Sequence, residues 1–379
     1  MNRNPIFRAL IVLLTVSCAE NKALDADAGM DGAGGPDAGQ KIDFDKVDML
    51  VVVDNSQSME EEQVRLAESF RNLVNSLIDP PASWKVPPVD DIRVGVVTSD
   101  MGTGTDVFDY RLLKMEVRQC DPCCPCGDEA KLQCVDNDAC DGGAPPWLES
   151  TPDNPDEELA DEFASLARAG TDGCDFQMQL FAASYALQRV DQKEFLRGDN
   201  ALLVIIIVSA KDDCSAQCTS SFWGHYWEAY DYDEDLYCAE FQHDLIPVEL
   251  VTDNIKRKGD DRADIIPGSV VFAGIVGVPM VDGCQGKGNE IAGCLDLGEM
   301  EYAGEEDEDG DHHLGKTCFS EETNPDTGEP ETSAVPGRRF VELAQKFGEN
   351  GYIYSICNED WSPAMKDIAR RIATILKGE

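Results

Sequence analysis

The chain has 379 residues, of which 74 are acidic and 31 are basic, giving a formal net charge of −43 at neutral pH. An excess of negative charge of this size argues against nucleic-acid binding through phosphate neutralisation. Fifteen cysteines are typical of an exported protein and not of one kept in a reducing cytosol. Setting Cys18 aside leaves fourteen, an even number that disulfide pairing can use up.

The first residues are interpreted as a lipoprotein signal peptide that covers residues 1–17. Arg3 and Arg8 precede a short apolar stretch, residues 9–16, which is far below the ~20 residues that a membrane span requires. The stretch ends in a lipobox-like sequence, in which cleavage leaves Cys18 as a lipid-modified N-terminus. The alternative is ordinary secretion, with Cys18 removed or left as a thiol.

Residues 18–41 are rich in Ala, Gly and Asp and contain few apolar side chains. Such a segment cannot offset the entropy of ordering, and like charges keep it extended, so we interpret it as an acidic tether. The rest of the chain has no other long apolar segment, so the expected membrane attachment is through the N-terminal lipid only. Because Ala19 and not Asp follows Cys18, the outer membrane or cell surface is the expected location.

Residues 42–379 alternate between apolar runs and amphipathic segments. This alternation is typical of an α/β protein with a doubly wound, mostly parallel sheet and helices on both faces. The length favours one domain that carries Cys-rich, disulfide-bonded insertions at about 102–158, 211–240 and 279–335. Buried strands are predicted at residues 49–53, 92–98, 201–208, 269–276 and 352–356, and helices at residues 60–78, 176–190, 246–258, 339–347 and 362–376.

The cysteines of the first insertion allow two interpretations. Their spacing includes Cys-x-x-Cys-Cys-x-Cys, which suggests zinc. Disulfides are favoured because the chain is expected to be exported, although spacing alone leaves the connectivity open. The six residues are Cys120, Cys123, Cys124, Cys126, Cys134 and Cys140.

The most informative stretch is the turn between the first predicted strand and the first predicted helix. The apolar run stops at Asp54, which is followed by Ser56 and Ser58. This turn lies at the carboxyl edge of the predicted sheet, where open α/β folds bind ligands. One carboxylate and two hydroxyls form an oxygen-only set that suits a hard cation such as Mg²⁺. The alternative is structural, because Ser and Asp are also ordinary turn and N-cap residues.

Asp-Asn-Ser-Gln-Ser-Met, with this strand before it and this helix after it, resembles the metal-ion-dependent adhesion site (MIDAS) of von Willebrand factor type A (VWA) domains. The resemblance covers essentially all of residues 43–379 apart from the insertions, and it implies a VWA/Rossmann-like fold. It also implies that Ser56 and Ser58 bind Mg²⁺ (or Mn²⁺ or Ca²⁺) while Asp54 supports them. A carboxylate from a protein ligand would then complete the octahedron. The overall layout is similar to predicted VWA-domain lipoproteins of Gram-negative bacteria.

The family pattern requires a threonine from the loop before the third helix. Residues 169–175 form that loop, and Thr171 is the candidate ligand, with Asp172 or Asp175 as substitutes. The surrounding residues do not reproduce the usual Gly-x-Thr-x-Thr pattern. The same residues equally make a good turn and N-cap.

The pattern also requires an aspartate directly after the fourth strand, where this chain has Ala210. Either Asp212 reaches back to the site as the remaining candidate ligand, or the site has lost one acidic supporter and gained a nearby ammonium group at Lys211. Losing a carboxylate lowers the affinity for a dication, so we expect weaker cation binding than the family pattern implies.

Three functions follow from these observations. The first is a surface-anchored lipoprotein whose VWA domain mediates protein–protein binding or adhesion through the metal site. The second is an interaction protein with a degraded, metal-free site that binds through its disulfide-rich loops, which Ala210 favours. A hydrolase built on Ser56 is disfavoured, because Asp-x-Ser-x-Ser carries no base and neither Gly-x-Ser-x-Gly nor His-Glu-x-x-His occurs. We therefore expect a binding protein and not an enzyme.

Overall fold

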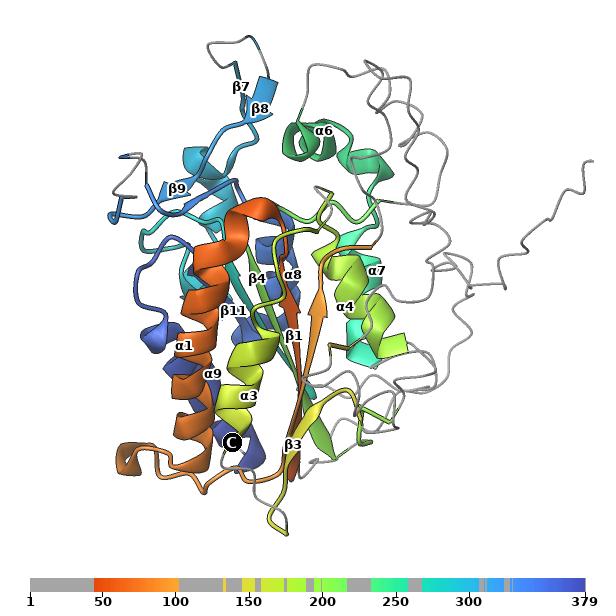
Figure 1. Ribbon diagram of the computed structural model, residues 1–379, viewed down its shortest axis with the longest axis vertical. Helices are drawn as coiled ribbons and strands as arrows, with labels where there is room; N and C mark the ends of the chain where they lie inside the picture. Colours follow the sequence, from red (N-terminus) through yellow and green to blue (C-terminus); the bar gives the residue numbers. More distant parts are fainter. Residues whose placement is uncertain are drawn as a thin grey trace, which may run out of the picture. The chain divides into compact units, whose positions relative to one another are not determined.

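A seven-stranded, mostly parallel sheet forms the centre of the protein in a computed structural model (Figure 1). The spatial order of its strands is β3 (Leu148–Ser150), β2 (Ile92–Thr98), β1 (Lys46–Val53), β4 (Ala201–Ser209), β5 (Val270–Val276), β11 (Gly351–Ser355) and β6 (Gly286–Lys287). The five central strands run parallel, while β3 and β6 pair antiparallel at the two edges. The structure describes residues 44–101, 132–133, 145–153, 158–173, 176–188, 194–198, 200–216, 233–257, 268–306, 310, 312–323, 328 and 330–378.

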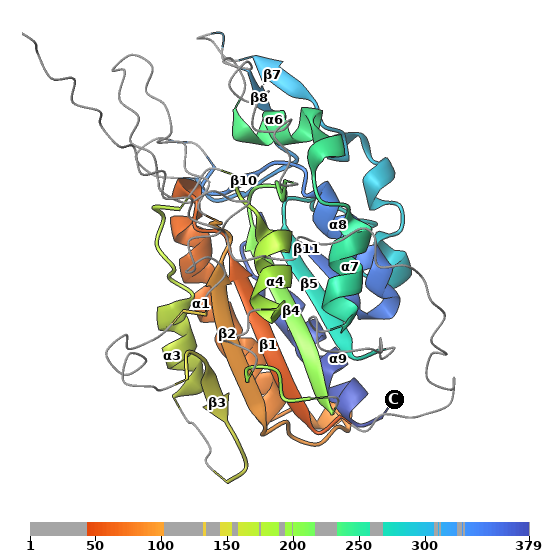
Figure 2. The same ribbon diagram turned by 90° about the vertical axis from the view of Figure 1, so that its right-hand side faces the viewer.

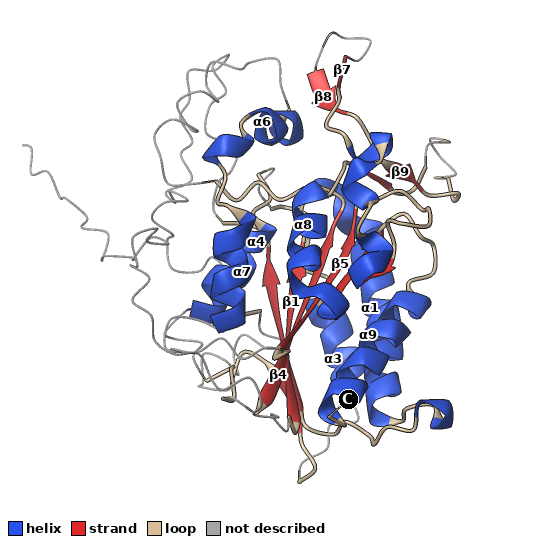
Figure 3. Cartoon of the chain, turned by 180° about the vertical axis from the view of Figure 1, so that it is seen from behind, coloured by secondary structure: helices blue, strands red, loops and turns tan. Residues whose placement is uncertain are grey.

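Helices cover both faces of the sheet, as expected from the alternation of strands and helices. Helices α1 (Glu60–Ile78), α3 (Leu159–Leu166) and α9 (Ser362–Leu376) pack together on one face (Figure 3). Helices α4 (Gln179–Gln188), α7 (Val248–Arg257) and α8 (Arg338–Phe347) pack on the other face (Figure 2). Within the described ranges, no helix is long and apolar enough to cross a membrane.

The sheet is built from apolar strands that are buried on both faces. All nine residues of β4 and all seven of β5 are buried, which a strand covered by helices on both sides requires. In β1, side chains alternate between the two helical layers, so that Val51 and Val53 join the cluster that also contains residues of α1 and α9. The continuous apolar runs in the sequence reflect this double burial.

The structure confirms most of the predicted elements and corrects some details. The bounds of α1, β2 and α9 agree with the predicted residues 60–78, 92–98 and 362–376. Within α1, Val64 is 36% exposed, whereas Leu66 is fully buried. The apolar stripe of α1 is centred on residues 66, 70, 73 and 77, one helical face that Val64 only borders.

The insertions contain short elements that the periodicity did not predict. The first adds β3 to the edge of the sheet, and α3 follows it, with Phe163 stacked on Phe70 of α1. The second contains α6 (Glu234–Glu240). The third contains two small antiparallel pairs, β7 (Gly304–Glu306) with β8 (His312–Leu314) and β9 (Cys318–Phe319) with β10 (Ser333–Ala334).

Three pairs of cysteines lie at disulfide distance, which confirms that the second and third insertions are disulfide-bonded. Cys214 and Cys238 close the second insertion, and Cys284 and Cys294 close a turn in the third. The third pair, Cys318 and Cys357, joins the third insertion to the residues that follow β11. The six cysteines of the first insertion, together with Cys18, Cys174 and Cys218, lie outside the described residues.

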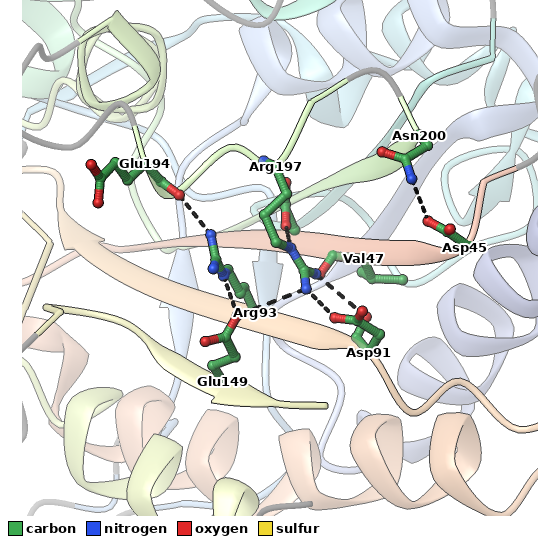
Figure 4. A network of polar contacts seen from close by, with 9 residues as sticks. Asp45, Val47, Asp91, Arg93, Glu149, Glu194, Arg197 and Asn200 are labelled. Carbon is green, nitrogen blue, oxygen red and sulfur yellow. Dashed lines mark hydrogen bonds and ion pairs between the residues drawn. The ribbon is translucent and has the colours of Figure 1, made fainter. Parts of the chain in front are cut away.

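A buried ion-pair network holds the amino ends of the central strands (Figure 4). Arg197, just before β4, donates from Nε and from its main-chain nitrogen to the Asp48 carboxylate, both at 2.7 Å. The same guanidinium pairs with Asp91 and donates to the Val47 carbonyl at 2.7 Å. Because Asp48 is 2% exposed within β1, its charge depends on Arg197 for compensation.

We expect Arg197→Met to lower the free energy of unfolding by about 3–5 kcal/mol, because it leaves the Asp48 carboxylate buried without its partner. The matched control is Arg71→Met, because Arg71 pairs with Asp161 at the surface, where the side chains are 52% and 62% exposed. Removing that exposed pair should cost less than about 1 kcal/mol. Urea unfolding measures both variants, and equal losses would contradict this assignment.

Candidate cation site at the carboxyl edge of the sheet

The parallel register brings the ends of three strands together at one edge. Val53 of β1 pairs with Val208 of β4 and with Thr98 of β2. The next residue of β1, Asp54, donates its main-chain N–H to the Val208 carbonyl at 3.0 Å. The chain then passes through a short 3₁₀ turn, Gln57–Met59, into α1. The predicted strand-to-helix turn is therefore present at the carboxyl edge.

The carboxylate of Asp54 is completely buried and is held by neutral donors. Its Oδ1 accepts a hydrogen bond from the Ser56 main-chain nitrogen at 2.8 Å, and its Oδ2 accepts one from the Ser209 hydroxyl at 2.6 Å. Burial raises the pKa of Asp54, while the hydrogen bonds from Ser209 and Ser56 and the nearby charge of Lys211 oppose this rise. These bonds fix the orientation of a carboxylate whose charge is not otherwise neutralised.

Among the aspartates of the described ranges that are at most 2% exposed, Asp54 differs from Asp48 and Asp213 in having no counter-ion. Asp48 pairs with Arg197, and Asp213 pairs with Arg339 at 2.9 Å. In the same part of the chain, no Lys, Arg or His nitrogen lies within ion-pair distance of Asp54. A buried carboxylate without a counter-ion is costly for folding, so this position calls for a reason other than stability.

The two serines of the turn differ in their surroundings. Ser56 is 2% exposed, and its Oγ makes no hydrogen bond with the part of the chain that the structure describes. It lies close enough to the Asp54 carboxylate to help lower that group's pKa, but not in hydrogen-bonding geometry. Ser58 is exposed to solvent. A buried hydroxyl with unused lone pairs beside a carboxylate fits the donor set of a hard cation.

The loop that carries Thr171 lies against this turn. Gln63 of α1 donates from Nε2 both to the Asp54 carbonyl at 3.1 Å and to the Gly170 carbonyl at 2.8 Å. Gly173 donates its N–H to the Asn55 carbonyl at 2.9 Å. Thr171 itself is half-buried. The structure therefore brings the Thr171 loop to the Asp54 turn without showing a contact made by the threonine hydroxyl.

The two alternative ligands of this loop differ in what the structure describes of them. Asp172 is exposed, and Asp175 lies outside the described residues. The position of Gly173 explains the close approach of the loop to the turn. A Cβ at this residue would lie 2.4 Å from side-chain atoms of Asn55, so a larger residue would push the loop away.

Asp212, predicted to reach back to the site, has a different set of partners in the structure. Its Oδ2 accepts a hydrogen bond from the Tyr302 hydroxyl of the third insertion. Its Oδ1 accepts from the main-chain nitrogens of Asp213 at 2.9 Å and Arg339 at 3.3 Å. Burial raises the pKa of Asp212 to about 7, although Tyr302 and Arg339 oppose the rise. Its contacts therefore connect β4 to the third insertion and α8.

Sequence reasoning missed the polar residues that support Asp54. Ser209, the last residue of β4, faces Asp54 across the strand pair, and the register was the signal that could have identified it. Gln179, the first residue of α4, donates from Nε2 to the Ser209 hydroxyl at 2.7 Å. Gln63 holds the main chain of the turn. All three are uncharged, so they do not stand out as acidic ligands in the sequence.

Comparisons with known proteins add no assignment to this geometry. No family model matches the chain, and no curated protein shows significant similarity to it. In the described ranges, no three or more His, Cys, Asp or Glu side chains form a group that could hold a metal ion. Among the described residues, a cation at this edge would therefore depend on hydroxyl oxygens and the carboxylate of Asp54.

The raised pKa of Asp212 predicts a pH dependence of stability. The folded protein holds this proton more tightly than the unfolded chain, whose carboxyl has a pKa of 3.8 against about 7 in the fold. Stability contributed by the protonated form is therefore lost as the pH rises between about 4 and 7. We expect the free energy of unfolding to fall over this window by up to about 4 kcal/mol relative to Asp212→Asn. Urea unfolding at several pH values measures the difference, and a pH-independent difference would contradict the prediction.

Proposed function

We propose that the protein is a VWA-type binding module that takes a divalent cation at the carboxyl edge of its sheet and uses it to bind a carboxylate of a partner protein. One observation carries the proposal. The buried Asp54 carboxylate has no counter-ion within the described ranges, and the buried Ser56 hydroxyl beside it makes no hydrogen bond there. A cation would satisfy both groups at once.

The residues of the turn suit such an ion in type and position. Ser56 and Ser58 would hold it through their hydroxyls, and Thr171 would contribute from the adjacent loop. Asp54 would support it from the buried side, where Ser209 and the Ser56 main chain already orient the carboxylate. When bound, Mg²⁺ or a similar ion supplies open coordination positions that a partner's carboxylate oxygen can fill.

The charge of the protein gives the ion a second use. With a net charge of −43, the chain repels acidic partners unless a local positive centre is present.

The third insertion contacts this edge through a hydrogen bond from the Val335 N–H to the Ala210 carbonyl at 3.0 Å. It also contacts α1 through a bond from the Thr332 hydroxyl to Glu62 at 2.5 Å. In all three views, α6 and the β7–β8 pair lie beyond this edge (Figures 1 to 3), where they would restrict what reaches the ion.

The proposed location follows from the amino-terminal residues. A lipid on Cys18 would anchor the protein, and residues 18–41 would act as an acidic tether between the membrane and the VWA-type domain. The binding edge would then face the surroundings of an outer membrane or a cell surface. In this proposal the protein is a binding protein and not an enzyme.

A second candidate is metal-free binding by the disulfide-rich insertions. It is favoured by Ala210 at the position of the expected aspartate and by the engagement of Asp212 with Tyr302. The third insertion also exposes large apolar side chains, which metal-free contacts would use. Met280 is 41% exposed, Val281 45% and Phe319 50%.

Calorimetric titration of the purified, disulfide-bonded protein with Mg²⁺, Mn²⁺ and Ca²⁺ tests the proposal. We expect weak, saturable binding that Asp54→Asn abolishes, because the variant removes the one carboxylate that the described residues place at the site. Ala210→Asp should tighten binding by about tenfold or more, because it adds a second carboxylate, whereas the neutral, matched variant Ala210→Asn should not. Thermal unfolding of each variant verifies that it is folded. If the wild type binds none of the three cations, the metal-free candidate replaces the proposal.

A further inference from the structure

The hydroxyl of Ser209 lies at the centre of a hydrogen-bond relay behind the Asp54 carboxylate. Its Oγ accepts from Gln179 Nε2 at 2.7 Å and from the Lys211 main-chain nitrogen at 3.0 Å. Its single proton has two acceptors within reach, Asp54 Oδ2 at 2.6 Å and the Lys211 carbonyl at 2.8 Å. An ionised carboxylate is the stronger acceptor, so the proton points to Asp54.

Gln179 enters this relay from a rigid position. It is the first residue of α4 and is fully buried. The next residue, Leu180, donates its N–H to the buried carboxylate of Asp213 at 2.8 Å. Because Asp213 is also paired with Arg339, the start of α4 is fixed relative to the end of β4. The amide of Gln179 is thereby aimed at Ser209 by an ion pair that does not involve Asp54.

The other end of the same amide has no partner. Gln179 Oε1 is buried and accepts no hydrogen bond from the part of the chain that the structure describes. A buried amide that is satisfied at one end only costs folding free energy, and a methionine of similar length would avoid that cost. Among the described residues, the side-chain hydrogen bond that this amide makes is the one to Ser209.

The relay also has a consequence for charge. Ser209 and Gln179 are neutral, so they orient the Asp54 carboxylate without cancelling its charge, as a guanidinium would. The nearest ammonium group that influences Asp54, that of Lys211, lies 3.6 Å from a carboxylate oxygen of Asp235 in α6. The relay therefore orients the Asp54 carboxylate without giving it an ion-pair partner among the described residues.

We propose that Gln179 is a positioning residue of the cation site and acts through the Ser209 hydroxyl to hold the Asp54 carboxylate in the geometry that a cation requires. This inference rests on the proposed function of the turn as a cation site. It assigns the role of the missing second acid to a neutral pair, Ser209 and Gln179, from the two elements that flank the carboxyl edge. Neither residue needs to touch the ion.

The test is a double-mutant cycle on Mg²⁺ affinity, measured by calorimetry on the purified, disulfide-bonded protein. The variants are Gln179→Met, Ser209→Ala and the double variant, with Ser209→Thr as the matched control that keeps the hydroxyl. We expect Ser209→Ala to weaken Mg²⁺ binding by about tenfold and Gln179→Met by about threefold, as the loss of a charged and of a neutral hydrogen bond implies. Ser209→Thr should restore most of the affinity.

The cycle distinguishes a positioning role from a structural one. If Gln179 acts through Ser209, Gln179→Met should cost no further affinity in the Ser209→Ala background. An additive loss, or an unchanged affinity in Gln179→Met, overturns the inference while leaving the cation site in place. Absence of Mg²⁺ binding in the wild type overturns the proposed function, and this inference with it. Melting temperatures, measured in parallel, identify any variant whose loss reflects unfolding.

Discussion

Burial of the Asp54 carboxylate at the end of β1 is the constraint on which the rest of the carboxyl edge depends. A charged group removed from water must be compensated by hydrogen bonds, and the parallel register of β1 with β4 places Ser209 where it can supply one. The turn supplies a second bond from its own main chain. Gln63 of α1 then ties the turn to the loop that carries Thr171. Through its side chain and its main chain, Asp54 thus links β1 to β4 and to α1, and Gln63 extends the link to the Thr171 loop.

The two edges of the sheet solve the problem of buried charge differently. At the amino edge, the guanidinium of Arg197 forms ion pairs with the carboxylates of Asp48 and Asp91, which is the usual way to neutralise a buried charge in a fold. Asp213 and Arg339 repeat that solution under α4. Asp54 alone among these three buried aspartates is compensated by neutral groups, as far as the described residues extend. This difference in compensation supports the proposal that the Asp54 carboxylate serves a cation and not the fold.

Local sequence patterns predicted the elements that are defined by their own periodicity. In β1, β2, β4 and β5, and in α1 and α9, the spacing of apolar residues in the sequence matches the positions that are buried in the structure. The edge strands β3 and β6 were missed because two or three residues make no period, and they are strands only through pairing with β2 and β11.

The candidate site was predictable only in part. Asp54 and Ser56 follow an apolar strand directly, so their position at the carboxyl edge could be inferred. Asp212 was assigned to the site on its nearness to β4, but the direction of a loop side chain depends on Tyr302, which lies 90 residues away in sequence. The supporting pair of Ser209 and Gln179 depends on strand register and on how α4 packs, which no local pattern reveals.

The central claim is that a cation binds beside Ser56, and anomalous diffraction from crystals soaked in Mn²⁺ tests it most directly. Mn²⁺ takes the same oxygen ligands as Mg²⁺ and scatters anomalously, so its position can be located without assumptions about the ligands. The account predicts an anomalous peak within about 2.5 Å of Ser56 Oγ, at metal–oxygen bonding distance, and no peak in crystals of Asp54→Asn. A wild-type structure without a peak at this turn, or with its only peak elsewhere, would contradict it.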